Sequence, residues 1–139
     1  MKVVSAIVER GIDGEYPYSV FMDCDDLEYG LSGTGRDVQE AKSDFLDAYA
    51  EIKELYESQG RAFTQVEFKF QYDLPSFLRY YEYAFTLAGL ERITGVNQHQ
   101  LSHYINGTSK PRTKTVERIQ ESIRNFGRDI SDINLVCRK

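Results

Sequence analysis

The segment 87–119, LAGLERITGVNQHQLSHYINGTSKPRTKTVERI, decides the fold of the second half of the chain. Leu87 and Leu90 are spaced to lie on one face of a first short helix. The Gly95-Val96 pair then forms a tight turn, because glycine adopts the left-handed backbone that commonly ends helices. Residues 98–105, QHQLSHYI, follow with the apolar spacing of a second helix. The segment therefore predicts two short helices joined by a tight turn.

The second of these helices has a start signal, an inward face and a stop signal. Asn97 precedes it and can cap it, since an Asn side chain accepts a hydrogen bond from a free N–H of the first turn. Leu101 and Ile105 are four residues apart, which puts both on the inward face. The Asn106-Gly107 pair then ends the helix.

The outward positions of this helix carry amide, imidazole and hydroxyl groups instead of the Glu/Lys mixture of an ordinary solvated face. Amides can form paired hydrogen bonds with the edges of bases, so this composition suits a recognition helix in the major groove of DNA. The pattern predicts a helix-turn-helix, and the alternative is a helical hairpin that only packs. The outward residues are Gln98, His99, Gln100, Ser102 and His103.

The segment resembles the helix-turn-helix of phage-repressor-like (XRE/Cro) DNA-binding proteins. The matching features cover about a quarter of the chain: the Gly95-Val96 turn, the Leu101/Ile105 pair, Asn106-Gly107, Pro111 and the amphipathic stretch TKTVERI. One position departs from that family, because Glu91 stands four residues before the turn glycine, where the family usually has Ala.

The resemblance implies a set of DNA contacts. Gln98, His99 and His103 are expected to reach base edges, with Gln100 and Ser102 at the margins. Phosphate contacts are expected from the start of the second helix and from the loop after it, through Asn97, Asn106, Lys110, Arg112 and Lys114. Specific sites normally consist of two half-sites about one helical turn apart, so we expect a homodimer or homotetramer on palindromic double-stranded DNA.

The charge of the chain is divided unevenly between its halves. The 139 residues have a net charge of −5, but residues 1–75 hold 7 Lys/Arg and 16 Asp/Glu, giving −9, whereas residues 76–139 hold 10 and 6, giving +4. A basic half can contact phosphates, while an acidic half is repelled by DNA and complements a basic protein. The asymmetry predicts two units with different partners.

The sequence gives little support to catalysis, metal binding or membrane insertion. Cys24 and Cys137 form no CxxC pair and are interpreted as free thiols, and His99 and His103 lack a third metal ligand nearby. The local acidic cluster 23–28 does not converge from several elements, as a metal-dependent nuclease would require. The sequence has no evident signal peptide or bilayer-spanning run. We expect a cytoplasmic protein that is not an enzyme and uses no cofactor.

The first half predicts an α+β unit with the order β-β-β-α-β, followed by helices. The VEFKFQY stretch at 66–72 alternates strictly and is the clearest strand, while Asp13-Gly14 suits a hairpin turn and Gly33-Thr34-Gly35 suits a loop. We expect one domain over 1–73 and an all-α domain over 74–139. The expected strands are 2–9, 16–22, 27–32 and 66–72, and the expected helices are 36–58, 76–84, 98–105 and 113–126, together with the short helix that carries Leu87 and Leu90. The tail residues Ile130, Ile133, Leu135 and Val136 suit a strand or an oligomer contact.

The first half resembles the HicB antitoxin family. The DGEY turn at 13–16, the GTG loop at 33–35 and the VQEA helix start at 38–41 match, over about residues 1–72. The family's Pro-rich segment after the second strand is replaced here by FMDCDDL at 21–27. The resemblance implies a partial ribonuclease-H-like fold without nuclease activity, a basic RNA-cleaving HicA-like toxin as partner, and repression of the shared operon.

The long helix expected at 36–58 has an acidic outer face. Its inward positions are Val38, Ala41, Phe45, Ala48, Ile52 and Leu55. Its outer positions suit either a solvated face or a patch for a basic partner, and comprise Glu40, Asp44, Asp47, Glu51 and Glu54. The combined expectation is a HicB-type antitoxin that regulates transcription; the alternatives are a regulator without a toxin and a protein-interaction module.

Overall fold

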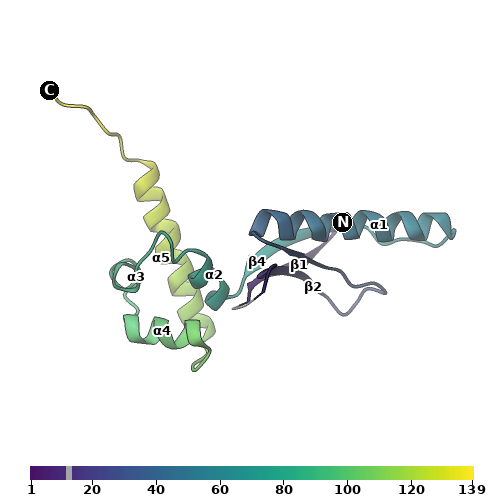
Figure 1. The fold of residues 1–139 in the computed structure, drawn as a ribbon, viewed down its shortest axis with the longest axis horizontal. Coiled ribbons are helices and arrows are strands. Elements are labelled where there is room, and N and C mark those ends of the chain that lie inside the picture. The colour runs from purple at the N-terminus through teal and green to yellow at the C-terminus, as the bar shows by residue number, and fades with distance from the viewer. Residues whose placement is uncertain (12–13) are drawn as a thin grey trace. The chain divides into compact units, whose positions relative to one another are not determined.

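The chain is an α+β protein whose structure, a computed structural model, describes residues 1–11 and 14–139. Within these ranges it contains four strands and five helices, divided into two compact units, Met1–Tyr80 and Tyr81–Lys139 (Figure 1). The Asp13-Gly14 turn expected between the first two strands begins outside the described residues. None of the helices in the described ranges combines the length and apolar character that spanning a bilayer requires.

The first unit is built on a mixed sheet with the strand order β3-β2-β1-β4. Its strands are β1 (Lys2–Arg10), β2 (Tyr18–Asp23), β3 (Ser32–Gly35) and β4 (Val66–Tyr72). β2 pairs antiparallel with both β1 and β3, whereas β4 pairs parallel with β1, from Lys2↔Val66 to Val8↔Tyr72. The parallel pair requires a crossover, which α1 (Val38–Ser58) provides by running along the sheet (Figure 1).

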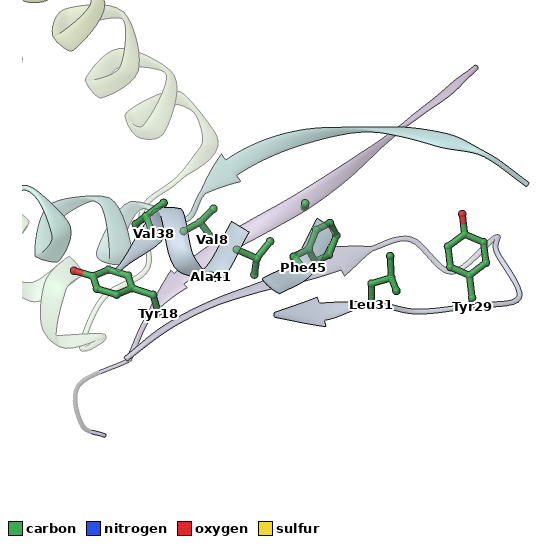
Figure 2. Packing of buried hydrophobic residues seen from close by; sticks show 9 residues of the cluster. Val8, Tyr18, Tyr29, Leu31, Val38, Ala41 and Phe45 are labelled. Carbon is green, nitrogen blue, oxygen red and sulfur yellow. The ribbon is translucent and has the colours of Figure 1, made fainter. Parts of the chain in front are cut away.

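The core of this unit lies between α1 and one face of the sheet (Figure 2). The alternation of β4 is confirmed, because Glu67, Lys69 and Gln71 are exposed while Val66 is buried and Phe68 and Phe70 pack on the core. The side chains with almost no exposed surface are Ala6, Val8, Val20, Ala41 and Phe45.

The third strand lies later in the chain than the sequence predicted. Residues 27–31, expected to form most of that strand, belong to a loop whose Tyr29 and Leu31 are nevertheless buried. The Gly33-Thr34-Gly35 segment, expected to be a loop, instead forms β3 and pairs with β2. A Cβ at Gly35 would lie 2.4 Å from the Ala41 backbone nitrogen, and one at Gly33 the same distance from that of Phe45. The absent side chains are therefore what allows α1 to lie directly on this strand.

The long helix α1 begins and ends close to its predicted bounds, but its last turn faces differently. Asp37 caps it by accepting a hydrogen bond from the Glu40 N–H at 2.7 Å. Leu55, predicted to face inward, is 51% exposed, whereas Tyr56 is only 4% exposed. Tyr56 packs edge-on against Tyr29 and Phe63, so the last turn packs on aromatic side chains from the loops. These contacts explain why Tyr56, and not Leu55, faces inward.

The helices that follow β4 are divided between the two units. α2 (Leu74–Tyr80) ends four residues before the predicted helix 76–84 does, because residues 81–84 form a turn. It belongs to the first unit, so the division falls after Tyr80, whereas the sequence predicted a boundary after Asp73. The second unit holds α3 (Leu87–Thr94), α4 (Gln98–Asn106) and α5 (Thr113–Ser131).

The C-terminal helix α5 is longer than predicted, and the tail that follows it is exposed. Its apolar pattern continues past Phe126 to Ile130, which extends the helix to Ser131. Phe126 packs edge-on against Phe85 within the second unit. The tail residues Leu135 and Val136 lie outside any strand and are exposed, so the strand alternative for the tail is not formed.

Candidate nucleic-acid interface

Local hydrogen bonds fix the turn between α3 and α4. Thr86 caps α3 by accepting from the Gly89 N–H at 2.9 Å. Gly95 ends the helix in the left-handed conformation, with φ of 74°, and donates its N–H to the Glu91 carbonyl at 2.7 Å. The buried Thr94 hydroxyl donates to the Leu90 carbonyl and accepts from the Val96 N–H. The turn predicted at Gly95 is confirmed, and the Gly95 and Val96 N–H groups and the Thr94 hydroxyl are hydrogen-bonded within it.

Two side chains cap the start of α4. Asn97 Oδ1 accepts from the His99 N–H at 2.8 Å, as the sequence predicted. Glu91 reaches across from α3, and its Oε1 accepts from the Gln98 N–H at 3.2 Å. Glu91, the residue that departs from the repressor-like pattern, thus joins α3 to α4. Sequence reasoning missed this role because a contact between two helices leaves no periodic pattern.

The inward face of α4 is made by a different pair than predicted. Leu101 is fully buried and Tyr104 is nearly so, whereas Ile105 is only half-buried. Leu90 of α3 and Ile119 of α5 are also buried in this unit. The correction follows from helix geometry, because residues three apart share a face as readily as residues four apart.

The outward face of α4 presents the predicted polar side chains to different extents. His99, His103 and Asn106 are exposed, and their spacing of four and three residues places them on one stripe. Gln98, Gln100 and Ser102 are half-buried and flank that stripe. The structure thus brings the five predicted base-contacting residues onto one short helix, with the two imidazoles the most accessible.

The loop after α4 is tied to the helix by two hydroxyl groups. His103 Nδ1 lies 2.8 Å from Thr108 Oγ1, and Gln100 Nε2 donates to Ser109 Oγ at 3.1 Å. Gly107 enters the loop in the left-handed conformation, with φ of 74°. Sequence reasoning did not identify Thr108 or Ser109 as part of the site.

Positive charge gathers where this loop joins α5. Lys110, Arg112 and Lys114 are exposed. Arg112 occupies the capping position of α5 but makes no side-chain cap hydrogen bond. The first N–H groups of a helix carry partial positive charge, so an uncapped start beside three cations favours an anion such as phosphate.

The predicted acidic patch on α1 is partly occupied by contacts within the chain. Asp44 Oδ2 accepts from the Thr34 N–H at 2.9 Å, and Glu40 pairs with Arg36 at 3.4 Å. The exposed carboxylates on this helix that remain from the predicted set are those of Asp47, Glu51 and Glu54.

The acidic loop after β2 has structural partners of its own. Lys2 pairs with Asp26 at 3.0 Å, and this hydrogen bond raises the pKa of Lys2. Arg61 lies 3.6 Å from Glu28. Within residues 1–11 and 14–139, no three His, Cys, Asp or Glu side chains are grouped in a way that could hold a metal ion. Cys24 and Cys137 are free thiols.

Comparison with known proteins adds no identification. No family model, curated protein or solved structure matched the chain.

Proposed function

We propose that this protein is a sequence-specific DNA-binding regulator of transcription in which α3, the Gly95 turn and α4 act as an XRE/Cro-like helix-turn-helix. One observation carries the proposal: α4 buries Leu101 and Tyr104 and presents imidazole, amide and hydroxyl groups outward, next to a basic loop. Such a face matches the donors and acceptors of base edges in the major groove.

The contacts divide into base readout and positioning. His99, His103 and Gln98 face the base edges, with Gln100 and Ser102 beside them. The cations of the following loop and Asn106 contact phosphates, together with the amide nitrogen of Asn97, whose oxygen is already used in capping. Because one module covers a short site, the protein acts as a homodimer or homotetramer on a palindromic operator.

The first unit serves a second role in this proposal, as a HicB-like antitoxin domain. Residues 1–80 carry 8 Lys/Arg and 16 Asp/Glu, whereas residues 81–139 carry 9 and 6. The exposed carboxylates of Asp47, Glu51 and Glu54 offer a basic, HicA-like toxin a complementary surface. The protein then represses its own operon in the cytoplasm. The alternative is a regulator or interaction module without a toxin partner.

The DNA test uses fluorescence anisotropy with the duplex upstream of the protein's own gene and a scrambled duplex, each at two salt concentrations. Gln98→Ala is expected to weaken operator binding by about 1–3 kcal/mol and to leave scrambled binding unchanged. Gln120→Ala, which removes an exposed glutamine from α5, is the matched control. Equal weakening on both duplexes by Gln98→Ala would contradict base readout by α4.

The partner test uses the full chain. A triple variant, D47K/E51K/E54K, is expected to lose capture of a basic protein encoded beside its gene while retaining operator affinity. Retained capture would move the partner surface elsewhere, and absence of capture by the unmodified chain would favour the regulator without a toxin.

A further inference from the structure

The ring of His103 is held by Thr108, a residue of the loop that follows α4. Thr108 Oγ1 lies 2.8 Å from Nδ1 of the ring, and the same hydroxyl donates to the His103 carbonyl at 3.3 Å. The Thr108 N–H also donates to that carbonyl, at 3.0 Å. Two bonds from Thr108 thus fix its hydroxyl above the end of α4.

The tautomer of the His103 ring decides which hydrogen bonds this clamp can make. A threonine hydroxyl has one hydrogen, and a carbonyl oxygen can only accept. When that hydrogen goes to the His103 carbonyl, the contact with Nδ1 is satisfied only if the ring nitrogen is the donor. The neutral ring then carries its hydrogen on Nδ1, and Nε2 is left as an acceptor. With the opposite tautomer, one of the two contacts is lost.

The clamp is anchored beyond Thr108. Gln100 bonds the neighbouring Ser109, so two successive loop residues are tied to two outward positions of α4, three residues apart. The ring of His103 is otherwise exposed. Its free edge, which carries Nε2, is therefore the edge available to a ligand.

We propose that His103 presents Nε2 as a hydrogen-bond acceptor and thereby selects a base that offers an amino group in the major groove, adenine N6 or cytosine N4. The major-groove edges of guanine and thymine offer hydrogen-bond acceptors but no amino group, so their lone pairs would face the lone pair of His103 Nε2. Binding excludes water from the groove, so a polar group left without a hydrogen-bond partner there is costly. The tautomer of His103 therefore becomes a preference between bases. This inference rests on the proposed DNA-binding function of α4.

The tautomer is measurable without DNA. The chain has two histidines, so long-range ¹H–¹⁵N correlation spectra of the full protein at pH 8 contain two imidazoles, assigned with His99→Gln. The expected result is a protonated Nδ1 and an unprotonated Nε2 at His103. Thr108→Val, which replaces the hydroxyl with a methyl group, should abolish this preference, whereas Thr108→Ser should keep it. An Nε2-protonated ring in the unmodified protein overturns the proposal, whatever the protein binds.

The base preference is measured by competition among operator duplexes carrying each of the four bases at the position protected by His103. Discrimination of about tenfold in favour of adenine or cytosine is expected, as for one hydrogen bond that leaves a buried partner unpaired when it is lost. His103→Ala and Thr108→Val should flatten it, while Thr108→Ser should retain it. Preference for guanine overturns the proposal but not DNA binding, whereas loss of selective binding to every duplex would overturn both.

Discussion

Replacing Gly35 with alanine is expected to destabilise the first unit through a single methyl group. In this structure the added Cβ would lie 2.4 Å from the Ala41 N and 2.8 Å from the Glu40 carbonyl carbon, both backbone atoms of α1. Ordinary van der Waals contact begins near 3.4 Å, so helix and strand must separate by about 1 Å.

The size of the loss in the free energy of unfolding follows from the contacts that this separation weakens. Ala41 and Phe45 of α1 are fully buried against the sheet, and a gap of 0.5–1 Å forfeits roughly a quarter to a half of each lost contact's dispersion energy. The new methyl group itself contributes roughly 0.8 kcal/mol of burial. Since overpacking typically costs about 1–3 kcal/mol, we expect a net loss of about 2 kcal/mol in the free energy of unfolding. In a unit of this size that corresponds to a decrease of about 8–16 °C in Tm.

The assay is thermal and urea unfolding followed by far-ultraviolet circular dichroism. Gly30→Ala is the matched control, because a Cβ at Gly30 would meet no atom within 4 Å. The control should unfold with the unmodified protein or slightly above it, and Gly33→Ala should behave like Gly35→Ala. If Gly35→Ala and Gly30→Ala have the same midpoint, the close approach of α1 to β3 is wrong.

Three further outcomes are expected. Glu91→Ala leaves the Gln98 N–H without its acceptor and should destabilise the second unit by about 1 kcal/mol, with Glu91→Gln milder; equal effects in thermal unfolding would argue against the cap. Burial raises the pKa of Tyr29 to about 12, so the contribution of Tyr29 to stability is complete below pH 10 and is lost between pH 10 and 12. Absorbance at 295 nm should show one late-titrating tyrosine that Tyr29→Phe removes. A titration curve that Tyr29→Phe leaves unchanged would refute this. Lys110→Ala should reduce the slope of log K against log salt by about 0.9, and an unaltered slope would remove Lys110 from the phosphate contacts.

Local signals predicted much of the secondary structure. The strict alternation of VEFKFQY gave the bounds of β4, and the positions of Asn97, Gly95 and Gly107 gave the ends of α3 and α4. These signals act within one or two turns of chain, so they can be interpreted without knowing what packs nearby.

The remaining features depend on contacts between distant residues. β3 was missed because GTG has a single side chain, that of Thr34, and so shows no alternation, and only the approach of α1 gives those glycines a strand role. The Glu91 cap joins two helices across seven positions, and Tyr56 is inward because Tyr29 and Phe63 lie beside it. In the candidate site, the polar face of α4 could be predicted, whereas the Thr108 clamp could not.

The bond between Asp44 and the Thr34 N–H also affects how the sheet meets other chains. β3 and β4 are the two edges of the sheet, and an edge strand offers unpaired N–H and C=O groups to any passing strand. On β3, the Asp44 carboxylate already occupies an outward N–H, and the strand is only four residues long. Strand addition to this protein, whether by a partner or in aggregation, is therefore directed to the seven-residue edge of β4.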